Sequence, residues 1–100
     1  MKQTDLKESN LSGAKLDDVD LKGANLSGAK FERSKNSNSN FSESTISNSN
    51  FKQANINNVN FRKTLFNNSN FEKSKFKSSD FTDANLSEAS FNHAVLDSVN

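Results

Sequence analysis

The chain has 100 residues and a mass of 11.1 kDa, which is the usual size of one domain, so we expect a single domain over residues 1–100. Thirteen Lys and Arg against twelve Asp and Glu give a net charge of +1, which is too small to attract nucleic acid or an anionic membrane by itself. Cysteine is absent and His93 is the single histidine, which excludes disulfides, thiolate chemistry and metal sites rich in Cys or His.

The apolar residues of this polar chain recur at every fifth position. Mean hydropathy is −0.85 and only 31% of the residues are hydrophobic, which alone would suit disorder. However, nineteen of the twenty positions of this lattice, numbered i, carry a large apolar side chain. Position i−2 holds small or β-branched residues, and position i−1 is Asp or Asn in twelve of twenty repeats. The lattice comprises Met1, Leu6, Leu11, Leu16, Leu21, Leu26, Phe31, Asn36, Phe41, Ile46, Phe51, Ile56, Phe61, Phe66, Phe71, Phe76, Phe81, Leu86, Phe91 and Leu96.

A period of five fits neither a helix nor a continuous strand, but it fits a chain that turns a corner every five residues. The first expected extended segment is 4–6, the next is 9–11, and the series continues to 94–96, each with its two end residues pointing inward. The corners fall at i+1 and i+2. Gly13, Gly23 and Gly28 all lie at i+2, where a type II turn requires positive φ. Asn at four further i+2 positions tolerates the same geometry, whereas Lys, Glu, Arg and Ser elsewhere favour a type I-like corner.

These repeats resemble the pentapeptide-repeat family, whose pattern is Ala-(Asp/Asn)-Leu-X-X. Close copies are Ala24-Asn25-Leu26-Ser27-Gly28 and Ala84-Asn85-Leu86-Ser87-Glu88, and the pattern covers the whole chain without insertion. The resemblance implies an all-β fold, a right-handed quadrilateral parallel β-helix with about five coils of four pentapeptides. Every twentieth residue would then lie in one inward or outward column. Asn36 is expected to point into the core.

The residues that could carry chemistry form no recognisable active site. His93 and the adjacent Asp17 and Asp18 fall at expected corners, with no concave site around them. No phosphate loop or dinucleotide motif occurs. We therefore expect no enzyme, no cofactor and no metal site. Because no apolar run approaches about 18 residues and no secretory signal is present, we also expect a cytoplasmic chain with no membrane contact.

The charge distribution bears on the function. Grouped by the four expected sides of the solenoid, the formal charges are 0, −2, +2 and +1, so no side carries a sustained acidic field. The family that the chain resembles includes quinolone-protecting proteins, which bind DNA gyrase as acidic, duplex-like rods. The sequence favours instead a non-catalytic structural or protein-interaction solenoid with an unidentified protein partner, and no binding of nucleic acid. A DNA-mimicking inhibitor or protector of a DNA-binding enzyme such as DNA gyrase is the alternative.

Three outward features stand out from the polar background. Lys15, Lys35 and Lys75 share one i−1 column with Lys77 close by, which indicates either a basic binding stripe or a solvated strand face. A second column is expected to set the register between coils, or to order water. It contains Asp20, Asn40, Asn60, Asp80 and Asn100. Leu65 and Val95 break the polar pattern at i−1 and are interpreted as scattered surface residues.

The ends of the expected rod suggest an interaction surface. A solenoid without caps presents its core and open backbone groups to solvent. The repeat pattern runs from Met1 to Asn100, so the final coil would expose Phe81, Leu86, Phe91 and Leu96. We expect a weak homodimer through this uncapped end.

Overall fold

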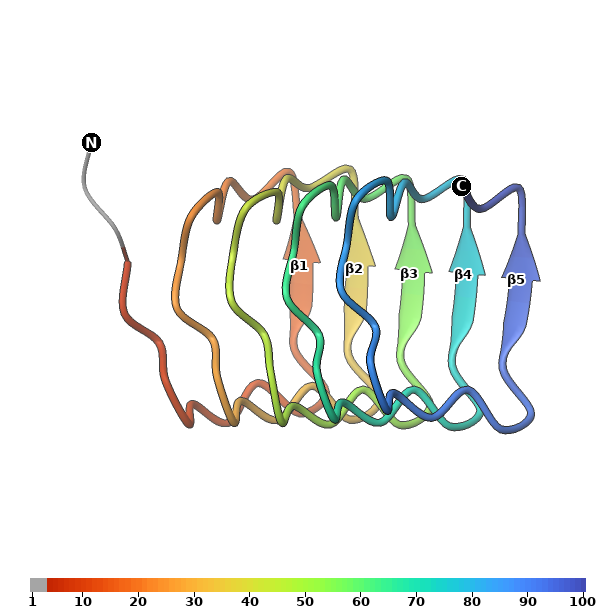
Figure 1. The fold of residues 1–100 in the computed structure, drawn as a ribbon, viewed down its shortest axis with the longest axis horizontal. Helices are drawn as coiled ribbons and strands as arrows, with labels where there is room; N and C mark the ends of the chain where they lie inside the picture. The colour runs from red at the N-terminus through yellow and green to blue at the C-terminus, as the bar shows by residue number, and fades with distance from the viewer. Residues whose placement is uncertain (1–3) are drawn as a thin grey trace.

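The fold is a solenoid whose coils stack along one axis (Figure 1). A computed structural model describes residues 4–100, so the lattice residue Met1 lies outside the described residues. Within that range the chain forms one parallel five-stranded sheet in the order β1-β2-β3-β4-β5. The strands are β1 (Lys15–Asp17), β2 (Lys35–Ser37), β3 (Asn55–Asn57), β4 (Lys75–Lys77) and β5 (Val95–Asp97). The chain advances as a right-handed coil from the N-terminal to the C-terminal end, and the molecule measures 36 × 26 × 23 Å.

A shift of 20 residues relates each coil to the next. We call the side formed by β1 to β5 the strand side. There Lys15 pairs with Lys35, and each later strand pairs with the next at the same offset of 20 residues, ending with Lys75 and Val95. The other three sides repeat this offset through single parallel bridges, such as that between Asp20 and Asn40. Four pentapeptides therefore close one coil, and β1 to β5 span about four turns. This confirms the fold class and the columns expected from the sequence.

The corners depart from the sequence-based expectation. Every described i+2 residue has positive φ, from +51° to +61° for sixteen non-glycine residues and about +72° for the three glycines. The type I-like corner expected for Lys, Glu, Arg and Ser is therefore wrong. Its physical reason lies between the coils, because the N–H at i+2 donates to the i+1 carbonyl of the next coil. Examples are Glu8 to Ser27 at 2.8 Å and Lys63 to Thr82 at 2.9 Å. This bond recurs at successive coils. It outweighs the cost of positive φ for a non-glycine residue, which is roughly 1–2 kcal/mol.

Each coil contains two kinds of corner, one on three of its sides and the other after the strand. Thirteen described corners on three sides close with an N–H to C=O bond from the residue at i+3 to the lattice residue at i, such as Ala24 to Leu21 at 3.0 Å. At ten of these corners the Asp or Asn at i−1 accepts the N–H at i+1 through its Oδ1 atom. The short acidic or amide side chain therefore holds the corner as an Asx turn. Among residues 4–100, the corners that follow β1 to β5 have neither bond.

Phenylalanine rings stack along the axis and fill the middle of the rod. The ring centroids of Phe31, Phe51, Phe71 and Phe91 follow one another at 4.3, 5.1 and 4.8 Å with nearly parallel planes. Rings of neighbouring columns meet edge to face at 5.0–6.4 Å. Both arrangements are favoured by the ring quadrupole. Lattice residues over 26–81 are buried, whereas the leucines over 6–21 are only half-buried.

The core also contains polar groups, most of which are satisfied. Small hydroxyl residues at i−2 bond to backbone carbonyls, as Ser69 does to Ile46 of the preceding coil at 2.9 Å. Asn36 points inward with 1% of its surface exposed, as expected. Its Nδ2 donates to Ser34 Oγ at 3.0 Å, but its Oδ1 has no partner. Asn36 is therefore an incompletely satisfied polar residue within an apolar column.

Candidate functional site

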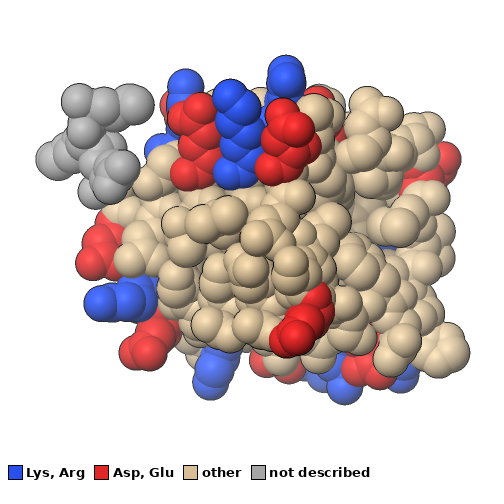
Figure 2. Space-filling model, in the orientation of Figure 1, with Lys and Arg blue, Asp and Glu red and all other residues tan. Residues whose placement is uncertain are grey.

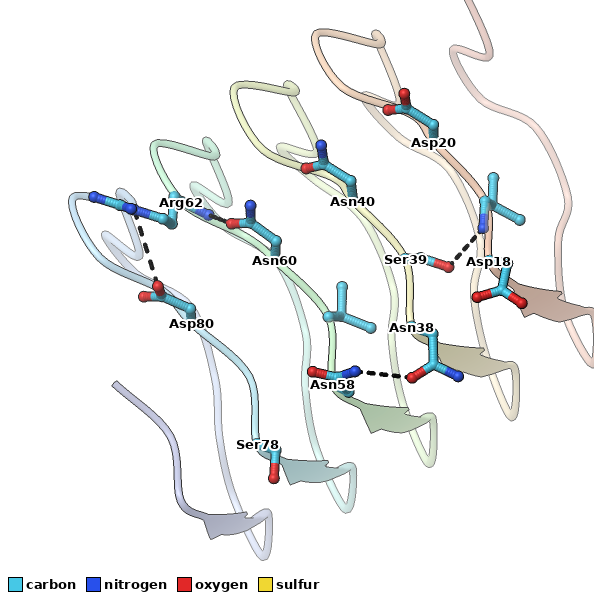
Figure 3. Close-up of a pocket in the computed structure, with 12 residues that line it drawn as sticks. Asp18, Asp20, Asn38, Ser39, Asn40, Asn58, Asn60, Arg62, Ser78 and Asp80 are labelled. Carbon is cyan, nitrogen blue, oxygen red and sulfur yellow. Dashed lines mark hydrogen bonds and ion pairs between the residues drawn. The ribbon is translucent and has the colours of Figure 1, made fainter.

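An open groove of about 630 Å³ runs along the corner that follows the strands (Figure 3). We call it the corner groove. At these corners the N–H at i+3 does not donate to the lattice carbonyl at i. Its lining, polar except for two valines, comes from four successive coils: Asp18, Val19, Asp20, Asn38, Ser39, Asn40, Asn58, Val59, Asn60, Arg62, Ser78 and Asp80.

Hydrogen bonds within the protein already engage much of the corner groove. Asn58 Nδ2 donates to Asn38 Oδ1 at 2.8 Å, and Asn38 Nδ2 donates to Asp17 Oδ1 at 3.2 Å. The N–H of Val19 donates to Ser39 Oγ at 3.0 Å, which replaces the missing turn bond. This polar network therefore links neighbouring coils and stabilises their register.

The outward column expected to set register lies along the same groove. In four of its members, over 20–80, the Oδ1 atom accepts the N–H two residues later. Asp80 also accepts the hydroxyl of Thr82 and lies 3.9 Å from Arg62 Nε. The hydroxyl and N–H of Thr82 lower the pKa of Asp80, and Arg62 adds to the effect. Asp80 is therefore a stable carboxylate at neutral pH, with no property of a proton-transfer group.

The other titratable groups singled out from sequence are not brought together. His93 is exposed at the corner before β5, with φ of +60°, whereas Asp17 and Asp18 are exposed at the corner after β1, four coils away. Over residues 4–100 there is no group of three His, Asp or Glu side chains arranged to hold a metal ion. The same residues contain no helix long and apolar enough to cross a bilayer.

The lysine column lies on the strand side, as the 20-residue register requires. Lys15 is the direct neighbour of Lys35 across the β1–β2 pair, and Lys75 follows beyond Asn55. Lys77 is on the same strand as Lys75 and points outward with it. All four lysines are exposed. The structure thus brings the predicted basic residues onto one flat face.

The C-terminal end of the rod is apolar. Phe81, Leu86, Phe91 and Leu96, which we call the end layer, line a hollow of about 160 Å³ together with Val99 and Asn100. Leu96 is 53% exposed although it is a lattice residue, whereas Phe81 is 9% exposed. The four residues predicted from the sequence to form an end surface are therefore together. Leu65 and Val95 are exposed on different sides, as interpreted.

Sequence reasoning missed the corner groove and the open corners beside it. A signal was present, because the i−1 column of the strand side reads Lys, Lys, Asn, Lys and Val over positions 15–95. Four of these five residues cannot form the Asx turn that closes corners elsewhere. The i−1 column with the fewest Asp and Asn residues, Asn55 alone, marks the side where the regular strand forms.

Family models match the chain over its length: the pentapeptide repeat region over residues 24–100 and the pentapeptide repeats (8 copies) over residues 1–33. The chain belongs to the pentapeptide-repeat family. Pentapeptide-repeat proteins are generally non-catalytic structural repeat proteins. No curated protein matches the chain in sequence.

Solved structures of other pentapeptide-repeat proteins share the fold. A protein from the Arabidopsis thaliana thylakoid lumen has a TM-score of 0.74 and 18% identity, covering 92% of this chain and 60% of that one. Rfr23 from the cyanobacterium Cyanothece has a TM-score of 0.61 and 20% identity, covering 92% and 87%. HetL from Nostoc, which is involved in heterocyst differentiation regulation, has a TM-score of 0.66 and 20% identity, covering 87% and 41%. The chain thus spans three fifths of the Arabidopsis protein and two fifths of HetL, and these similarities show the fold alone.

Proposed function

We propose that this pentapeptide-repeat protein is a non-catalytic interaction module that binds protein surfaces, and that the end layer mediates weak self-association. The observation that carries the proposal is the apolar end layer, in which Leu96 is exposed, Leu86 and Phe91 are half-buried, and Phe81 is buried beside them. A clustered apolar surface on a polar protein is typical of a contact site. A second copy supplies a matching surface when the two end layers meet about a two-fold axis, which closes the assembly.

The size of the end limits the strength of this contact. The cross-section of 26 × 23 Å bounds the buried surface at about 600 Å² per copy. Two such faces give about 1,200 Å² in total, which is the lower limit of a stable interface. Exposed carboxylates of Asp83, Glu88 and Asp97 belong to the same coil and repel their counterparts in a two-fold pair. We therefore expect weak association that strengthens as salt screens these charges.

Sedimentation velocity over a wide concentration range tests the proposal. Leu96→Lys places a charge in the end layer at an exposed position and should abolish the concentration-dependent increase in sedimentation coefficient. Phe91→Lys should act likewise, but Phe91 stacks on Phe71, so its fold must be checked by circular dichroism. Leu65→Lys adds the same charge at an exposed apolar residue on a side face and should leave association unchanged. A monomer at all concentrations, or equal effects of Leu96→Lys and Leu65→Lys, would contradict self-association through the end.

The surface charges give no support to the DNA-mimicking alternative. Figure 2 shows Lys and Arg interspersed with Asp and Glu on the face in view, without a continuous acidic field. A rod that imitates duplex DNA needs regularly spaced negative charge, because that is what a DNA-binding protein recognises. The protein-interaction function is therefore the better-supported proposal.

A further inference from the structure

A second surface, on the strand side, presents hydrogen-bond donors without internal partners. The first and third residues of each strand point outward, while the middle residues of β2, β3 and β4 are buried. The parallel register aligns one outward column of Lys and Asn with another of Ser, Asn and Lys. We call this surface the donor face; it comprises Lys35, Ser37, Asn55, Asn57, Lys75 and Lys77.

The donor face differs from the polar surface elsewhere on the rod. Asn40, Asn60 and Asn70 each use Oδ1 to hold their own corner. In contrast, across residues 4–100 the side chains of the donor face form neither a hydrogen bond nor an ion pair within the protein. The ion pairs of this part of the chain join Lys52 to Glu72 and Arg62 to Asp80, away from the face. Its ammonium and amide groups are thus available to an external acceptor.

The spacing of the positive charges favours an anionic partner. Lys75 and Lys77 are two residues apart on one strand, hence about 7 Å apart at Cα, and both point outward. Lys35 lies two strands away in the column of Lys75, at about 10 Å. Like charges so close together repel in the free protein, and carboxylates placed between them relieve this repulsion. A shallow hollow of about 310 Å³ gives such groups access to Lys75 and Lys77 beside Asn55 and Asn57, and Asp97 and Val95 of β5 also line it.

Acidic residues at both ends of the donor face restrict the length of an anion that could bind there. Asp17 on β1 and Asp97 on β5 lie beyond its two ends in the column of Lys77. A long polyanion aligned with the rod would pass over both carboxylates, whereas a cluster of two or three acidic side chains would not. The four lysines of the strand side, Lys15 included, also neutralise too few phosphates for strong nucleic-acid binding. No aromatic residue of the chain is available for base stacking at this face, because its residues are Lys, Asn and Ser.

We propose that the donor face binds a short acidic segment of a partner protein, with two or three Asp or Glu carboxylates placed between Lys35, Lys75 and Lys77. This inference goes beyond self-association and rests on the proposed function only in taking the module to bind protein. The amides of Asn55 and Asn57 donate to the same carboxylates. Each contact is exposed and weak, so binding depends on all of them together and falls as salt rises.

Titration with a synthetic peptide, Glu-Ser-Glu-Ser-Glu, followed by NMR at low salt, tests this inference. We expect amide shifts confined to β2–β4. The triple variant Lys35→Gln/Lys75→Gln/Lys77→Gln should weaken binding about tenfold, since three exposed ion pairs of roughly 0.5 kcal/mol each are lost. The matched variant Lys22→Gln/Lys30→Gln/Lys63→Gln removes the same charge from exposed lysines away from the strand side and should change affinity by less than about twofold.

Three outcomes would overturn the inference. These are no saturable shifts with the peptide, equal weakening in both triple variants, or tighter binding of a 20-base-pair duplex or heparin than of the peptide at the same face. The last outcome would assign the surface to long polyanions. The end layer is untouched by these substitutions, so the sedimentation test of self-association succeeds or fails independently.

Discussion

Replacing Asn36 by Leu should raise the melting temperature. Asn36 lies in an apolar column between Leu16 and Ile56, and its Oδ1 has no hydrogen-bond partner. A buried unpaired acceptor costs about 1–3 kcal/mol, and burial of a Leu side chain contributes about 1.5–3 kcal/mol. Against these gains stand the lost bond to Ser34, worth about 1 kcal/mol, and overpacking of about 1–3 kcal/mol. The central values leave a net stabilisation of about 1 kcal/mol.

The lost bond to Ser34 has a replacement in the same fold. Ser74 occupies the equivalent column position and donates its hydroxyl to the Phe71 carbonyl at 2.6 Å. Ser34 can therefore turn toward the carbonyl of Phe31, to which its own N–H already donates. The double variant Asn36→Leu/Ser34→Ala removes even this requirement, because Ala54 stands in that column one coil later. It should be at least as stable as Asn36→Leu.

Thermal unfolding followed by circular dichroism measures the effect. For a domain of this size, 1 kcal/mol corresponds to a rise of about 4–8 °C. Asn55→Leu, an exposed substitution of the same type on the neighbouring strand, should change stability by less than about 0.5 kcal/mol. Asn36→Val removes the same polar group but adds less volume than Asn36→Leu. It therefore separates the cost of overpacking from the gain of removing the unpaired amide oxygen. Lower melting temperatures for both Asn36→Leu and Asn36→Val would refute the reasoning and show that the amide is structurally required.

Further predictions concern a corner, a carboxylate and a stacked ring. Gly13→Ala should cost about 1 kcal/mol by chemical denaturation; its added Cβ meets open space, so the cost comes from the φ of +72°, and an unchanged midpoint would contradict this. Asp80 has a lowered pKa, so its contribution is present above its ordinary value of 3.8 and is lost as pH falls through the lowered pKa. Asp80→Asn should therefore flatten the melting temperature between pH 5 and pH 2 (roughly the range of carboxylate titration), and parallel pH profiles would refute this cause. Phe71→Ala should cost about 3–5 kcal/mol in urea unfolding because the ring is fully buried between two others; a loss below about 1 kcal/mol would show that the stack closes over the gap.

The sequence predicts the core well because a five-residue lattice leaves few alternatives for large apolar residues. Phe31, Phe51 and Phe71 stack as the 20-residue columns require, and the inward position of Asn36 follows from its place in the lattice. The conformation of corners such as Lys63 was not predictable from residue preference, since the bond to the next coil decides it. The strands form on the side where Asx turns at i−1 are absent, and the scarcity of Asp and Asn in that column was a sequence signal whose meaning the hydrogen bonds supply.

The sequence likewise predicts some features of the candidate surfaces and not others. Lys15, Lys35 and Lys75 meet on one face because register alone determines their positions. The isolation of the donor face from internal acceptors depends instead on the directions of neighbouring side chains, which a linear pattern does not contain. The corner groove likewise lies along corners after β1 to β4 whose closing bonds are not formed, which the linear pattern does not state.

The 20-residue offset between coils also constrains how such a gene can lengthen or shorten. A tandem duplication of twenty codons inserts one coil and returns every downstream residue to its original side, so the lysines over 35–77 would stay on one face. A duplication of five codons preserves the apolar lattice equally well, yet it rotates everything downstream by one side, a quarter of the coil. Such an event would carry β4 and its two lysines away from Lys35 while leaving the core filled. Selection for stability alone would accept both events, whereas selection on a surface that spans several coils would accept only the first.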